Sequence, residues 1–118
     1  MLDSIKLDRS VLAAHFHNTY NRAIQNLVVA LSEGVQTMDS SVAGIGGCPY
    51  AKGASGNVAT EDVVFLCELL GIEHGIDIPK LIEVGDYISR ELNRENLARV
   101  KISDLDAIEA IRNEIFST

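Results

Sequence analysis

The feature that most constrains this chain is a glycine-rich run over residues 42–57, which directly follows an apolar, strand-like segment. The run contains five glycines, one proline and a single cysteine, Cys48. Glycines let a backbone bend without a Cβ penalty and approach a ligand closely, and packing alone does not require so many of them. We therefore predict a ligand-covering loop with Cys48 as a candidate for chemistry; the alternative is that Cys48 is a small buried residue.

The composition limits the class of protein. The 118 residues are enough for at most one domain, and the apolar fraction of 47% is typical of a globular chain. The formal net charge of −7 argues against a nucleic-acid or anionic-membrane partner, because no basic stripe is present to neutralise phosphates. Two cysteines form no disulfide framework, and the start does not resemble a secretory signal, so the predicted location is cytoplasmic.

The hydrophobic pattern predicts an α/β fold. Nearly continuous apolar runs at residues 11–16 and 35–42 are typical of parallel strands that are buried on both faces. Apolar residues at helical spacing predict helices at 19–32, 60–70, 79–92 and 103–116. A strand–helix–strand order implies a parallel pair joined by a right-handed crossover. Two strands alone leave both sheet edges unpaired, so the pattern indicates part of a larger barrel or sheet.

His15 and His17 stand at the predicted end of the first strand. Residues i and i+2 of a strand point to the same face, about 6.6 Å apart, so two imidazoles could converge on one metal ion. The alternative is one hydrogen-bonded core histidine and one exposed histidine. Two ligands are too few for a metal site, and further ligands would have to come from elsewhere.

Four other residues carry side chains with functional groups, and two of them have two interpretations. Asn57, at the end of the glycine run, is either a turn residue or an oxygen ligand. For Asp39 we favour an ion pair or a loop cap over a role at a ligand site. Cys67 falls within a helical apolar stripe and is predicted to be core, whereas His74 is predicted to lie on a surface loop.

Three segments resemble the hydroxymethylglutaryl-CoA lyase family. The run at 44–62 resembles the family's cysteine loop, 15–20 its His-x-His metal segment, and 38–43 its last barrel strand. The resemblance implies a partial (β/α)8 TIM barrel in which the two strands are the last two of eight. It covers residues 1–94, which we predict to be the C-terminal part of the barrel, and it leaves 95–118 as a tail helix outside the family resemblance.

The resemblance also implies an activity, the divalent-metal-assisted cleavage of 3-hydroxy-3-methylglutaryl-CoA to acetyl-CoA and acetoacetate, a reaction of leucine degradation and ketone body metabolism. By resemblance, His15, His17 and Asn57 are ligands of Mg²⁺ or Mn²⁺, and Cys48 and His15 take part in proton transfer. The implied substrate-loop residues are Gly46, Gly47 and Pro49. The implied partner is an acyl-CoA substrate, and the mitochondrial matrix is the alternative location.

The family's acidic metal ligand, its arginine and its catalytic glutamate have no counterpart in this sequence. We therefore expect the isolated chain to be inactive without the missing N-terminal barrel. The expected protein partner is a complementary N-terminal barrel chain or, in a homo-oligomer, a second copy. The first alternative is a non-catalytic remnant that serves as an interaction module. A weaker alternative is a related metal-dependent, Claisen-type synthase, which shares the His-x-His strand but is not expected to carry the cysteine loop.

Overall fold

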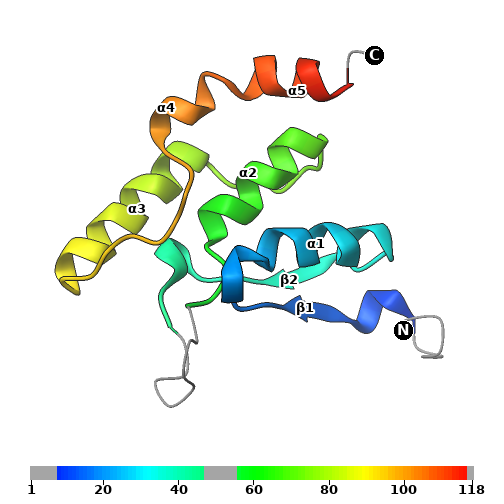
Figure 1. The fold of residues 1–118 in the computed structure, drawn as a ribbon, viewed down its shortest axis with the longest axis horizontal. Helices are drawn as coiled ribbons and strands as arrows, with labels where there is room; N and C mark the ends of the chain where they lie inside the picture. The colour runs from blue at the N-terminus through cyan, green and yellow to red at the C-terminus, as the bar shows by residue number, and fades with distance from the viewer. Residues whose placement is uncertain (1–7, 47–55, 117–118) are drawn as a thin grey trace.

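The computed structural model describes residues 8–46 and 56–116 (Figure 1). The strands and helices are β1 (Ala13–His15), α1 (Ala23–Ser32), β2 (Thr37–Asp39), α2 (Thr60–Leu70), α3 (Ile78–Glu91), α4 (Ile102–Leu105) and α5 (Ile108–Phe116). Helix α1 lies along the two strands, and α2 and α3 follow on the far side of β2 (Figure 1). Among the described residues, no helix is both long enough and apolar enough to cross a membrane.

The two strands pair in parallel, as the apolar runs predict, with Ala14 beside Met38. Each strand has three residues, which is shorter than the predicted segments 11–16 and 35–42. The strands are short because the residues that follow each of them no longer pair with the other strand. Their backbone groups form hydrogen bonds with the segment that follows the glycine run instead. Phe16 accepts from the amide of Val58 at 3.2 Å, and the Ser41 amide donates to the Val58 carbonyl at 3.0 Å.

The buried apolar residues form two separate clusters that meet at α2. The first joins the sheet, α1 and one face of α2, and it consists of Ala14, Ala23, Leu27, Val35, Val58 and Val63. The second joins the other face of α2 to α3, and it consists of Val64, Ile78, Ile82 and Val100. Complete burial of a leucine such as Leu27 contributes roughly 1.5–3 kcal/mol. Helix α2 is therefore the element that holds the two halves together.

The molecule is a flat slab with extents of 44 × 43 × 24 Å and a radius of gyration of 15.3 Å. A compact domain of this length has a radius of gyration of about 13.5 Å. Large apolar side chains stay exposed, among them Val11 at 69% and Val29 at 60%. This shape agrees with the expectation that two strands and their helices do not close around one complete core.

The start of one helix differs from the expected position. Helix α1 begins at Ala23, four residues later than expected, because Tyr20 and Asn21 adopt φ values of 54° and 60° that no right-handed α-helix accommodates. Helix α2 begins at Thr60, as expected, and the hydroxyl of Thr60 lies 2.7 Å from that of Ser40. The expected helix end at Gly71 is confirmed, since this glycine has the left-handed φ of 73°.

The tail forms two helices where one was expected over 103–116. Helix α4 begins at Ile102, one residue before the expected start, and the amide of the preceding Lys101 donates to Asp104 Oδ2 at 2.7 Å. Helix α5 then packs on α2, where Arg112 donates to the backbone carbonyl of Glu68. The tail is thus attached to the helix that joins the two clusters.

Candidate metal and active site

His15 and Asp39 are register partners at the C-terminal ends of β1 and β2. His15 Nδ1 lies 3.2 Å from Asp39 Oδ2, so Asp39 is paired with a predicted metal ligand at the end of the sheet. Both side chains are about half exposed, 54% for His15 and 58% for Asp39. The pair lies at the end of a parallel sheet where ligands bind in α/β proteins.

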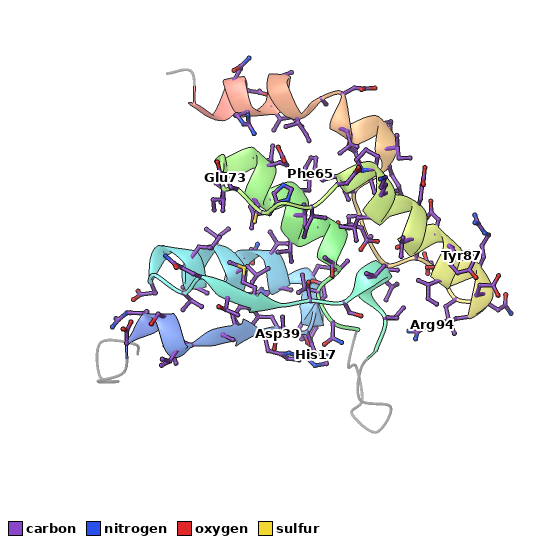
Figure 2. The ribbon with its side chains drawn as sticks, turned by 180° about the vertical axis from the view of Figure 1, so that it is seen from behind. His17, Asp39, Phe65, Glu73, Tyr87 and Arg94 are labelled. Atoms are coloured by element: carbon purple, nitrogen blue, oxygen red, sulfur yellow. The ribbon has the colours of Figure 1, made fainter. Side chains whose placement is uncertain are left out.

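His17 lies just beyond β1, not within it as the spacing argument assumed, and its backbone forms an isolated bridge with Asn57. The amide of Asn18 donates to the carbonyl of Gly56 at 3.0 Å and fixes this register. The rings of His15 and His17 have centroids 5.4 Å apart and planes inclined by 57°. Figure 2 shows His17 and Asp39 at the same end of the two strands. The fold therefore brings the three predicted ligands, two histidines and Asn57, to one end of the sheet.

The side chain of Asn57 is oriented by one hydrogen bond, from Nδ2 to the carbonyl oxygen of Ile45 at 3.2 Å. Its Oδ1 atom is buried, and no group in the described part of the chain hydrogen-bonds to it. A buried carbonyl oxygen without a partner is costly, at roughly 1–3 kcal/mol, and is a candidate metal ligand. This orphaned oxygen beside His17 fits a hard divalent cation that also accepts imidazole.

The donor set is incomplete for such a cation. Within residues 8–46 and 56–116, no three His, Cys, Asp or Glu side chains come together as a metal-binding group. Two imidazoles and one amide oxygen supply part of a ligand set, without the carboxylate that Mg²⁺ and Mn²⁺ prefer. The described residues therefore fit only one side of a metal site, and their role as ligands stays a prediction.

The two ends of the glycine run meet at a point where only glycine fits. A Cβ at Gly56 would overlap the carbonyl oxygen of Gly44, and a Cβ at Gly46 would lie 2.8 Å from Asn57 Nδ2. Gly44 and Gly46 also have positive φ values, 69° and 97°. The base of the run is thus a close backbone approach that sets the position of Asn57. The predicted site residues Gly47, Cys48 and Pro49 lie outside the described residues.

Glu61 is the residue of this region that sequence reasoning missed. Its side chain is 1% exposed, and both carboxylate oxygens accept from the Ala43 amide, at 2.9 and 3.1 Å. Burial raises the pKa of Glu61, and the hydrogen bond from the Ala43 amide opposes that rise. Ala43 has a φ of 56°, so Glu61 holds a strained residue at the start of the glycine run.

A cleft of about 360 Å³ opens beside Asn57. Asparagine side chains are frequent in its wall, and Arg99 and Lys101 supply positive charge next to Glu95. Asp62 fixes one wall, since it accepts from the amides of Arg99 and Val100 at 2.9 and 3.0 Å. The cleft gives polar access to the edge of the predicted metal site.

His74 is a further difference from expectation. Its side chain is only 13% exposed, and Nε2 lies 2.7 Å from Glu68 Oε1. The ring therefore belongs to the contact between α2 and the following turn, well away from the histidine pair. Cys67 is 8% exposed within α2, as predicted for a core residue.

Comparison with known proteins decides the family. A model of the HMGL-like family matches residues 1–88. This chain belongs to the HMGL-like family. The chain is 55% identical over 91 residues to a mitochondrial hydroxymethylglutaryl-CoA lyase from mouse. The matched residues are 77% of this chain and 28% of the mouse protein. The HMGL-like chain thus spans less than a third of that relative's length.

Solved structures agree with the partial-barrel fold. The HMG-CoA lyase of Bacillus subtilis superposes with a TM-score of 0.76 at 36% sequence identity, over 83% of this HMGL-like chain and 33% of the bacterial chain. An HMG-CoA lyase from Acinetobacter baumannii, solved in complex with coenzyme A and 3-methylmalate, gives a TM-score of 0.70 at 39% identity, over 75% and 29%. The two parallel strands and their helices are therefore a portion of the lyase barrel.

Proposed function

We propose that this chain supplies the His-x-His and glycine-loop portion of an HMG-CoA lyase active site. The proposed reaction is the cleavage of 3-hydroxy-3-methylglutaryl-CoA to acetyl-CoA and acetoacetate. The observation that carries the proposal is the buried, unpartnered Oδ1 of Asn57 beside His17 at the C-terminal end of the sheet. Among the relatives, the coenzyme A complex of the Acinetobacter baumannii protein supports an acyl-CoA substrate.

In the proposed reaction, His15, His17 and Asn57 would hold Mg²⁺ or Mn²⁺ from one side. The bound cation would supply Lewis-acid polarisation and orientation of the substrate's oxygens. The tertiary hydroxyl loses its proton to a base close to His15, and the carbon–carbon bond then breaks. Cys48 delivers a proton to the carbon of the acetyl-CoA enolate, which completes the second product.

The proposal includes a partner. We infer that a complementary N-terminal barrel chain contributes the missing carboxylate, and that this partner or a second copy closes the open edge of β1. An open, mostly apolar cleft of about 610 Å³ runs along this edge between β1 and α1, and Ala14, Phe16 and Val29 belong to its wall. Such a surface supports burial by a further strand and helix.

A domain exchange tests the catalytic proposal. The matching segment of the mouse relative is replaced by residues 1–88 of this chain, and cleavage of 3-hydroxy-3-methylglutaryl-CoA is measured with Mn²⁺. We expect activity within about tenfold of the mouse enzyme, and at least a hundredfold loss when His17→Ala or Cys48→Ser is added. The isolated 118-residue chain is expected to show no turnover. A well-folded but inactive chimera would contradict the proposal.

The exposed apolar surface favours an interaction module as the second candidate function. Val11, Val29 and Tyr87 are more than half exposed. Size-exclusion chromatography with light scattering separates the candidates. A monomer that unfolds cooperatively at all concentrations contradicts the need for a partner, whereas a concentration-dependent dimer supports self-association.

The compartment also belongs to the proposal. Relatives include hydroxymethylglutaryl-CoA lyases named as mitochondrial and one from zebrafish named as cytoplasmic. We favour the cytoplasm, with the mitochondrial matrix as the alternative. Imaging of the endogenous chain with a C-terminal tag distinguishes the two locations.

A further inference from the structure

The hydrogen bond between His15 and Asp39 has a chemical direction. An ionised carboxylate only accepts hydrogen bonds, so the His15 nitrogen that faces it, Nδ1, must carry the proton. In a neutral imidazole, one nitrogen carries the proton and the other keeps its lone pair. The 3.2 Å contact therefore leaves the lone pair of His15 on Nε2.

The fold itself holds His15 and Asp39 next to each other. His15 and Asp39 are register partners on neighbouring parallel strands, so the ladder itself sets the separation of their side chains. The hydroxyl of Ser40, the residue just after β2, lies 2.7 Å from that of Thr60. Asn57, the other predicted ligand, turns its Nδ2 group to Ile45. Asp39 is thus the side chain that forms a defined hydrogen bond with the His15 ring.

We propose that Asp39 is a positioning residue that holds neutral His15 in the Nδ1–H tautomer and presents the Nε2 lone pair to a divalent cation. A ligating histidine needs an unprotonated nitrogen, and a carboxylate on its other nitrogen fixes both tautomer and ring orientation. The identity of the cation rests on the proposed function, whereas the tautomer does not. Asp39 acts through His15, because its carboxylate contacts the His15 ring at Nδ1, on the side away from the Nε2 lone pair.

The half-exposed position of the pair makes the inference testable without unfolding the protein. A hydrogen bond between two half-exposed side chains contributes little to stability. Asp39→Ala is therefore expected to leave the fold intact while removing the acceptor. Glu83→Ala is the matched control, because Glu83 is an exposed carboxylate on α3.

Long-range ¹H–¹⁵N correlation spectra of the ¹⁵N-labelled 118-residue chain at pH 8, where imidazole is neutral, report which ring nitrogen carries the proton. We expect the Nδ1–H form to exceed the Nε2–H form by at least threefold for His15. Asp39→Ala should reverse this ratio, and Glu83→Ala should leave it unchanged. A wild-type His15 in the Nε2–H form overturns the inference, and this result does not depend on whether Asp39→Ala folds. An unchanged ratio in a folded Asp39→Ala variant overturns it as well.

A Mn²⁺ titration of the same samples separates this inference from the proposed function. Paramagnetic broadening of the His15 and His17 ring signals and of the Asn57 amide is expected, and Asp39→Ala should raise the Mn²⁺ concentration for half-broadening by about 10–100-fold. No broadening of any of the three signals would contradict the metal site of the proposed function. Equal broadening in wild type and Asp39→Ala would overturn the positioning role.

Discussion

Both carboxylate oxygens of Glu61 accept a hydrogen bond from the backbone amide of Ala43, with oxygen–nitrogen distances of 2.9 and 3.1 Å. The two residues are 18 positions apart, one in the first turn of α2 and the other at the start of the glycine run. The same carboxylate lies against Gly85 of α3, where a Cβ would collide with it. A single buried side chain thus links the base of the predicted site to two helices.

We predict opposite outcomes for two substitutions of Glu61. Glu61→Ala leaves the buried Ala43 amide without an acceptor, which should lower the free energy of unfolding by about 2–3 kcal/mol. Glu61→Gln keeps an acceptor oxygen and removes the charge, so a change of less than about 1 kcal/mol is expected. Urea unfolding followed by circular dichroism at pH 7 measures both values. Equal losses in the two variants would contradict the role of the hydrogen bond.

The pH dependence of stability provides a separate prediction. Because burial raises the pKa of Glu61, the folded state binds that proton more tightly than the unfolded state. The favourable contribution is therefore present at low pH and is lost as pH rises from the ordinary glutamate pKa, about 4.3, through the raised value.

Glu61→Gln removes this loss, so its free energy of unfolding relative to wild type should increase steadily from pH 4 to pH 7. Urea unfolding at half-unit pH steps gives the two curves. Glu83→Gln, on the exposed face of α3, is the control and should run parallel to wild type. If the stability curve of Glu61→Gln also ran parallel to that of wild type, the pKa of Glu61 would not be raised by burial.

The elements with strong local signals could be predicted from the sequence. Apolar runs locate both strands because a strand buried on both faces has no polar alternation, and Gly71 marks a helix end because only glycine adopts its φ without strain. The convergence of His15, His17 and Asn57 came from a family resemblance. Spacing indicates only the histidine pair, whereas Asn57 joins it through long-range pairing.

The remaining features depend on tertiary contacts that have no local signature. Acidic residues in the first turn of a helix are usually exposed to solvent, where they interact with the helix dipole. In α2, however, Glu61 is buried, and Asp62 accepts a hydrogen bond from the amide of Arg99, 37 positions away. The late start of α1 follows from positive φ values at Tyr20 and Asn21, residues with ordinary propensities. Such features require the packed structure.

The base of the glycine run should tolerate no side chain at Gly56. Gly56→Ala forces a Cβ onto the Gly44 carbonyl, a backbone atom that cannot rotate away, so we expect a loss of about 3 kcal/mol. Gly75→Ala is the control, because Gly75 has a positive φ of 72° with open space around it, and it should cost about 1 kcal/mol. Thermal unfolding of the two variants and of the wild type measures both losses of stability. A Gly56→Ala variant as stable as Gly75→Ala would contradict the close approach.

The attachment of α5 to α2 should depend on Arg112. Its guanidinium donates to the Glu68 carbonyl in the last turn of α2 and lies 3.6 Å from the Glu68 carboxylate. We expect Arg112→Ala to accelerate amide hydrogen exchange in α5 by about tenfold, which corresponds to about 1.4 kcal/mol of local stability. Exchange in α1 should not change. Arg90→Ala, which removes an exposed charge in the last turn of α3, is the control and should affect neither helix.

The thiol of Cys67 should be protected from alkylation in the folded chain. It is 8% exposed, and burial raises its pKa, with a further rise from the neighbouring Glu68 carboxylate. Both effects lower the reactive thiolate fraction, since a free cysteine has a pKa of about 8.5. We expect iodoacetamide at pH 8 to label Cys67 at least tenfold more slowly in buffer than in 8 M urea, as measured by mass spectrometry of its tryptic peptide. Because that peptide is resolved from the one containing Cys48, the readout is specific. Comparable rates in buffer and urea would show that α2 does not pack its cysteine face, which would also contradict the role of α2 as the element that holds the two core clusters together.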